Sequence, residues 1–93
     1  MWSLNGMATQ PMTDRSRDVV QAVVARILSS VLGHEVAPGT NVAASDDPVW
    51  DSLRQVEVMY AVEDTFGLRF DEGDFSTLVS SELIVDAVMR QPA

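Results

Sequence analysis

The sequence predicts a small all-α protein: a four-helix bundle with three main helices, one short helix and a long first loop. Three stretches carry apolar residues at three- and four-residue steps, which is the spacing of amphipathic helices. Capping residues such as serine, threonine or aspartate precede these stretches, and glycine or proline follows them. The chain has 93 residues and no cysteine, so we expect one small core without disulfides.

The first helix is predicted over residues 13–32, after a flexible leader of residues 1–12, and the folded domain over residues 13–91. Thr13 or Asp14 is expected to cap this helix, because their side-chain oxygens accept the free N–H groups of a first turn. Gly33 follows as its stop residue. The apolar stripe comprises Val20, Val23, Val24, Ile27, Leu28 and Val31.

Residues 34–50 lack helical periodicity and contain the proline, glycine, asparagine and aspartate residues that are typical of loops. A loop this long is unusual in a small domain unless it packs on the core or has a function. Val36, Val42 and Val49 are its predicted anchors to the core.

The second helix is predicted from Ser52 to about Phe66, with Asp51 as its N-cap and Gly67 as its end. Its buried stripe is expected to consist of Val58 or Met59, Val62 and Phe66.

A connector follows, with one short helical turn expected around residues 72–75. Ser80 or Ser81 is predicted to cap the last helix, and Pro92 prevents its extension. The apolar residues of the connector and of this helix are Leu68, Phe70, Phe75, Leu83, Ile84, Val85, Ala87, Val88 and Met89.

The chain is acidic, with fourteen Asp and Glu against six arginines, no lysine and a net charge of −8. Such a surface repels nucleic acid and anionic lipid, so neither is an expected partner. It attracts proteins with basic patches, although solubility alone explains the charge equally well. No stretch is apolar for long enough to insert into a membrane, and the N-terminus lacks a signal-peptide pattern, so a cytoplasmic protein is expected.

Ser52 would occupy the first position of the second helix. The unpaired N–H groups and the helix dipole at that end would stabilise a phosphate attached to the serine oxygen. The simpler interpretation is that Asp-Ser is an ordinary helix start, since such capping pairs are common.

The stretch DSLRQVEVMYAVEDTFGLRF, residues 51–70, resembles the acyl carrier protein family and its peptidyl carrier relatives. The match runs through Asp-Ser-Leu at 51–53, Val-Glu at 56–57 and Ala-Val-Glu-Asp-Thr-Phe-Gly at 61–67. The order of helices and loops fits over residues 14–89. Asp-Ser-Leu alone would be a weak signal, whereas this combination is specific.

In that family the serine carries a 4′-phosphopantetheine arm from coenzyme A, whose thiol holds acyl or aminoacyl groups as thioesters. The resemblance implies that Ser52 is the attachment site and that Asp51 assists its modification. The residues that match the partner-docking side of the second helix are Leu53, Val56, Glu57, Glu63 and Asp64. An ordinary solvated face is an equally good interpretation of the three acidic ones.

The resemblance implies a stand-alone, monomeric carrier that is not itself an enzyme and binds no metal of its own. Its expected partners are a phosphopantetheinyl transferase, an acyl- or aminoacyl-loading ligase, and a downstream synthase or transferase. The alternative from another class is a small acidic helical adaptor that binds its partners noncovalently.

Two departures from the family pattern point away from fatty acid synthesis, towards a specialised secondary-metabolic, lipid or cell-envelope pathway. Arg54 stands where fatty acid carriers usually have an acidic or polar residue, and is expected to lie near the phosphodiester or to select a partner. The family often has a glycine shortly before the motif, whereas this chain has Pro48, Val49 and Trp50 there. The side chain of Trp50 is the notable one. It is expected to pack as a staple against Gln55 or Val56, or else to shield the base of the arm.

Other chemistries fit poorly. His34, the only histidine, follows a helix stop, so a surface or C-capping role is expected, and the Gly-x-Ser-x-Gly elbow of serine hydrolases is absent. Residues 71–82 have the length of a calcium loop, but Gly73, Phe75 and Ser76 stand at its ligand and turn positions. No pair of titratable residues is marked as an acid–base couple.

Overall fold

The computed structural model describes residues 16–91, and within this range the protein is built from helices, as predicted. Thr13, Asp14 and the residues 1–12 assigned to the leader lie outside the described residues. The helices are α2 (Arg17–Leu32), a 3₁₀ turn (Ala44–Asp46), α3 (Ser52–Phe66), α4 (Asp74–Thr77) and α5 (Ser81–Arg90).

The start of α2 differs from the prediction. Ser16 is the N-cap, in an extended conformation, and its side chain accepts the Val19 N–H at 3.4 Å. Serine serves as well as threonine or aspartate there, because a short side-chain oxygen is all that the cap requires. The predicted end is confirmed: Gly33 has φ 78°, and its N–H bonds to the carbonyl of Ser29.

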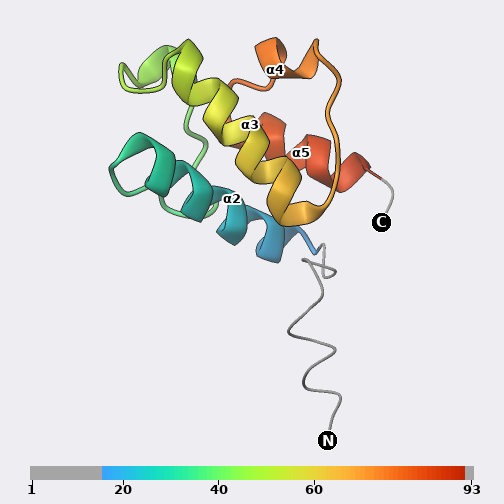
Figure 1. The fold of residues 1–93 in the computed structure, drawn as a ribbon. Coiled ribbons are helices and arrows are strands. Elements are labelled where there is room, and N and C mark those ends of the chain that lie inside the picture. Colours follow the sequence, from blue (N-terminus) through green and yellow to red (C-terminus); the bar gives the residue numbers. More distant parts are fainter. Residues whose placement is uncertain (1–15, 92–93) are drawn as a thin grey trace, which may run out of the picture.

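Three helices enclose the core: α2 packs against both α3 and α5, and α4 packs on α3 at one end of the bundle (Figure 1). The predicted buried residues of α3 are confirmed, and both Val58 and Met59 are fully buried. In α5, Leu83 and Met89 are exposed, because they lie off the buried side of this helix, which packs against α2. The innermost side chains are Val20, Val24, Leu28, Val58, Met59, Val62, Phe66, Ile84 and Val88.

The long loop after α2 is anchored at two of the three predicted residues. Val36 is buried and Val42 packs partly against the core, as expected. Val49 is the wrong anchor, since its side chain is 41% exposed, whereas the neighbouring Trp50 is only 4% exposed. An Asx-type turn, in which Asp47 Oδ1 accepts the Val49 N–H at 3.0 Å, directs the larger apolar side chain inwards.

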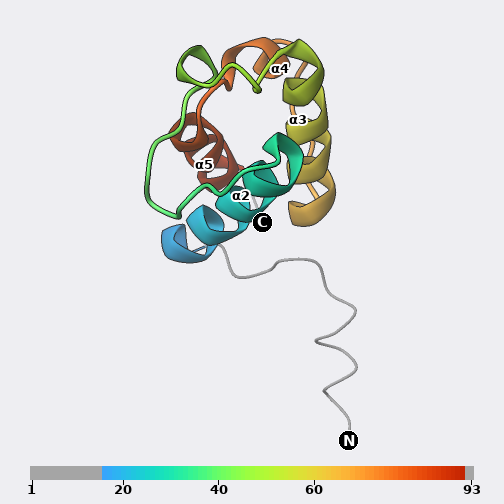
Figure 2. The ribbon, with the colours of Figure 1, turned by 90° about the vertical axis from the view of Figure 1, so that its left-hand side faces the viewer.

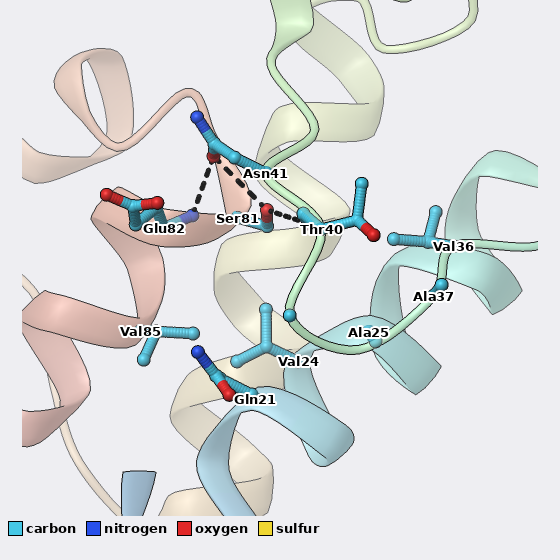
Figure 3. Close-up of a pocket in the computed structure, with 11 residues that line it drawn as sticks. Gln21, Val24, Ala25, Val36, Ala37, Thr40, Asn41, Ser81, Glu82 and Val85 are labelled. Carbon is cyan, nitrogen blue, oxygen red and sulfur yellow. Dashed lines mark hydrogen bonds between the residues drawn. The ribbon is translucent and has the colours of Figure 1, made fainter. Parts of the chain in front are cut away.

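The same loop is fixed to the start of α5, far away in sequence. Residues 43 and 80 form an isolated antiparallel bridge, and the Ser81 N–H bonds to the Val42 carbonyl at 2.8 Å. Ser81 Oγ in turn accepts the Val42 N–H. It also donates to the Thr40 carbonyl, while Asn41 Oδ1 accepts the Glu82 N–H (Figure 3). Ser80 is the N-cap of α5, so Ser81 is free for this second role.

The connector after Gly67, which has φ 66°, runs back along the bundle and places α4 beside the beginning of α3 (Figures 1 and 2). The helical turn predicted around residues 72–75 lies slightly later, at Asp74–Thr77. The rings of Tyr60 and Phe75 meet edge to face, with centroids 5.4 Å apart, and this contact packs α4 against α3.

His34 is exposed and pairs with Asp47, at the other end of the long loop, instead of capping α2. Its Nε2 lies 2.6 Å from Asp47 Oδ2, and Nδ1 contacts the Glu35 carbonyl at 3.3 Å. The hydrogen bond to the Asp47 carboxylate, followed by that to Glu35, raises the pKa of His34 above its ordinary 6.5. Burial alone would raise the pKa of Asp47, but hydrogen bonds from the Val49 N–H and His34 lower it below 3.8.

This pair makes stability depend on pH. Because the pKa of His34 is raised by folding, its contribution is complete below pH 6.5 and is lost as pH rises through the folded value. Asp47 contributes above pH 3.8, and its share is lost as pH falls through the lowered value. We therefore expect His34→Gln to lower Tm most between pH 3.8 and pH 6.5, where both groups contribute. The effect should shrink at higher pH, where His34 loses its charge.

Thermal unfolding of both proteins from about pH 5 to about pH 9, followed by circular dichroism, measures this dependence. Asp46→Asn is the matched control, since this exposed neighbour of Asp47 makes no side-chain bond within residues 16–91. A Tm difference between wild type and His34→Gln that stays constant over the whole range would contradict a stabilising ion pair.

Candidate functional site

Ser52 is the first residue of α3, and its side chain is exposed. Asp51 caps the helix as predicted: its Oδ1 accepts the Arg54 N–H and its carbonyl accepts the Gln55 N–H, both at 2.9 Å. The hydroxyl of Ser52 and the N–H groups of Ser52 and Leu53 make no hydrogen bond within residues 16–91. A free hydroxyl therefore stands at a helix end that presents partial positive charge.

An open groove runs beside Ser52, between the start of α3 and the α4 segment. Its walls are largely apolar, with polar groups at the rim. The lining residues are Ala44, Trp50, Asp51, Ser52, Gln55, Val56, Glu72, Phe75, Ser76 and Val79.

A buried pair of hydrogen bonds forms the floor of this groove. The Trp50 indole N–H donates to Gln55 Oε1 at 2.7 Å, and the Gln55 amide donates to the Leu78 carbonyl at 2.9 Å. Both side chains are buried. The contact predicted between Trp50 and Gln55 is thus present, but it is a hydrogen bond instead of the apolar staple that the sequence suggested.

The sequence did not predict that Gln55 would reach Leu78. Gln55 lies on the side of α3 that faces the core. A glutamine among apolar core positions was the one sign in the sequence that a buried hydrogen bond would form there. A buried amide needs partners for both its oxygen and its nitrogen, so a second partner had to be found away from α3.

The side of α3 that faces solvent carries both apolar and acidic residues. Leu53 is 62% exposed, Val56 38% and Tyr60 60%, and these three share a face because they are spaced by three and four residues. Glu57 and Asp64 are exposed on the same side. Tyr60 belongs to this surface, although the sequence analysis did not include it.

Glu63 is placed differently from the other acidic residues. It is half-buried, and its Oε2 accepts the Phe70 N–H at 2.8 Å. This bond holds the connector against the end of α3, so Glu63 has a role in the fold that the sequence did not indicate.

Arg54 lies in the first turn of α3, where a cation opposes the helix dipole. Its guanidinium approaches Glu57 Oε1 at 3.7 Å, and both side chains are substantially exposed. An exposed pair at that distance contributes little to stability, about 0–1 kcal/mol. Arg54 is therefore not explained by the folding of residues 16–91.

Comparisons of the chain with protein-family models, with curated proteins and with solved structures gave no match. Within residues 16–91, no three side chains of the metal-binding types are grouped closely enough to hold an ion. None of the helices in this part of the chain is both long and apolar enough to cross a bilayer.

Replacing Gln55 with methionine tests the floor of the groove. The substitution keeps the length of the side chain but leaves the Trp50 N–H and the Leu78 carbonyl buried without a partner. We expect the free energy of unfolding to fall by about 2–4 kcal/mol, since each orphaned group costs about 1–3 kcal/mol. Urea denaturation followed by circular dichroism measures the loss.

Gln21→Met is the matched control, because the half-buried Gln21 side chain makes no hydrogen bond within residues 16–91. Its stability should change by no more than about 0.5 kcal/mol. Equally small losses of unfolding free energy in the two variants would mean that the hydrogen bonds of Gln55 to Trp50 and Leu78 add nothing to stability.

Proposed function

We propose that the protein is a carrier of the acyl-carrier type, with a four-helix bundle that holds acyl or aminoacyl groups on a phosphopantetheine arm attached to Ser52. The observation that carries this proposal is the free, exposed hydroxyl of Ser52 at the start of α3, beside a partly apolar groove. The Asp-Ser-Leu motif and the residues that follow it resemble the family in which this serine is modified.

Attachment of the arm is a phosphoryl-group transfer to Ser52. Ser52 Oγ loses its proton, forms a bond to the β-phosphorus of coenzyme A, and the pyrophosphate bond breaks so that adenosine 3′,5′-bisphosphate leaves. The free N–H groups of Ser52 and Leu53 would then donate to oxygens of the resulting phosphodiester. When bound, the arm supplies a thiol that forms thioesters.

The residues around Ser52 fit this step. Asp51 holds the turn through one carboxylate oxygen, and its other oxygen makes no hydrogen bond within residues 16–91. That second oxygen would help to hold the magnesium that the modifying enzyme brings. No bulky side chain has to move before a transferase reaches the hydroxyl, because Asp51, Ser52 and Leu53 are all exposed.

The exposed face of α3 supports docking of partner enzymes. Leu53, Val56 and Tyr60 offer apolar contact, and Glu57 and Asp64 offer negative charge beside it. Charges at the rim accelerate association with basic partners without making the complex long-lived, which suits a carrier that visits several enzymes.

The same face would also serve a noncovalent adaptor, which is the second candidate. Tyr60, at 60% exposure, is the observation that favours it, since exposed aromatic side chains are common anchors of protein interfaces. An adaptor would need no modification of Ser52, so the two functions differ in one measurable property.

Incubation of the full chain with coenzyme A and a broad-specificity phosphopantetheinyl transferase should add one phosphopantetheine, seen by intact mass. Ser52→Ala should abolish this gain, because it removes the only atom that forms the new bond. Ser76→Ala, which alters another exposed serine of the same groove, should be modified normally. No gain in the wild-type chain would favour the adaptor.

The phosphodiester also accounts for Arg54 within this proposal. If its guanidinium pairs with the phosphate, Arg54→Gln should destabilise the modified protein more than the unmodified one, by about 0.2–1 kcal/mol at low salt. Thermal unfolding of both forms measures the difference. Arg69→Gln removes an exposed arginine of the connector and should affect both forms equally; the same result for Arg54→Gln would rule out the pairing.

A further inference from the structure

Two buried side chains that are hydrogen-bonded to each other, Trp50 and Gln55, line the groove beside Ser52 and form its floor. Gln55 lies at its inner end, held on one side by the Trp50 indole and on the other by the Leu78 carbonyl. Phe75 also lines the groove, and its ring packs edge to face with the ring of Tyr60. Within residues 16–91, no buried side-chain nitrogen or oxygen is left without a hydrogen-bond partner.

The side chains on the inner side of α3 are closed off from solvent. Val58, Met59 and Val62, which follow on the inner side of α3, are 0% exposed. A cavity of about 20 Å³ lies between α2, the long loop and α5, and no residue of α3 lines it (Figure 3). It has room for about one water, whereas a benzene-sized group needs a cavity of about 150 Å³.

An alkyl chain that passed from this groove into the core beside Gln55 would have to displace its buried side chain. That movement would leave the Trp50 N–H and the Leu78 carbonyl buried without partners, because a hydrocarbon offers neither a donor nor an acceptor. It would also free the end of α4, which Leu78 ties to α3.

We propose that this carrier takes short acyl or aminoacyl groups that stay in the open groove, and that Gln55 excludes long alkyl chains from the core. This inference rests on the proposed function, because it concerns the group carried by the arm on Ser52. Gln55 acts as a specificity-determining residue: it selects cargo by closing the interior, not by binding it. The polar rim formed by Glu72 and Ser76 suits a small, hydrated cargo.

The experiment compares arms of different length on the full chain. A broad-specificity transferase attaches acetyl-, hexanoyl- and dodecanoyl-pantetheine arms in which an amide replaces the labile thioester. Tm is measured for each product. The indole N–H resonance of Trp50, assigned with Trp50→Phe, reports whether its bond to Gln55 is kept.

We expect the hexanoyl and dodecanoyl forms to differ by less than about 2 °C, whereas burial of even one or two further methylene groups would raise Tm by about 4–8 °C. The indole resonance of Trp50 should be the same in all three forms. A Tm that climbs with chain length, together with a shifted indole resonance, would overturn the inference. If none of the three arms attached to Ser52, the proposed carrier function itself would be overturned.

Gln55→Ala removes the floor and should make Tm rise from the hexanoyl to the dodecanoyl form, although the unmodified variant is less stable than wild type. A variant that folds and still ignores chain length would show that Gln55 is not the barrier. The wild-type series decides the cargo question alone, even if this variant does not fold.

Discussion

The buried amide of Gln55 is the interaction on which the arrangement of the site depends. Residues 78–80 lie between α4 and α5, outside both helices, so the backbone groups of this segment need partners from elsewhere. The Gln55 amide donates to the Leu78 carbonyl, and the Ala44 N–H of the long loop donates to the Val79 carbonyl. The Val42 carbonyl of the same loop accepts the Ser81 N–H. Because Gln55 also accepts from Trp50, one side chain joins the residues before α3, α3 itself and the end of α4.

The inner side, the outer side and the first turn of α3 therefore have different roles. Its inner side, with Met59 and Val62, fills the core shared with α2 and α5. Its outer side presents Leu53, Val56 and Tyr60 to solvent. Its first turn presents Ser52 at a helix end with free N–H groups. A helix can separate these tasks because positions three and four residues apart lie on one side, whereas adjacent positions do not.

The proposed carrier function and the proposed short cargo both follow from this division. A carrier needs a reachable attachment point and a surface that binds partners briefly, and both lie outside the core. The closed floor separates the groove from the bundle interior, so loading the arm would leave the packing of α2, α3 and α5 unchanged. The protein would then present its cargo to enzymes without having to release it first from the interior.

The sequence by itself determined the all-α class, the ends of α3 at Asp51 and Gly67, and the position of Ser52 at its start. These features depend on local rules, namely periodicity, caps and the left-handed glycine. Tertiary structure decided that Trp50 and not Val49 anchors the loop, that Glu63 bonds to Phe70, and that Gln55 reaches Leu78. Which side chain is buried, and which distant carbonyl a buried amide meets, depends on packing between segments far apart in the chain, and no local pattern records it.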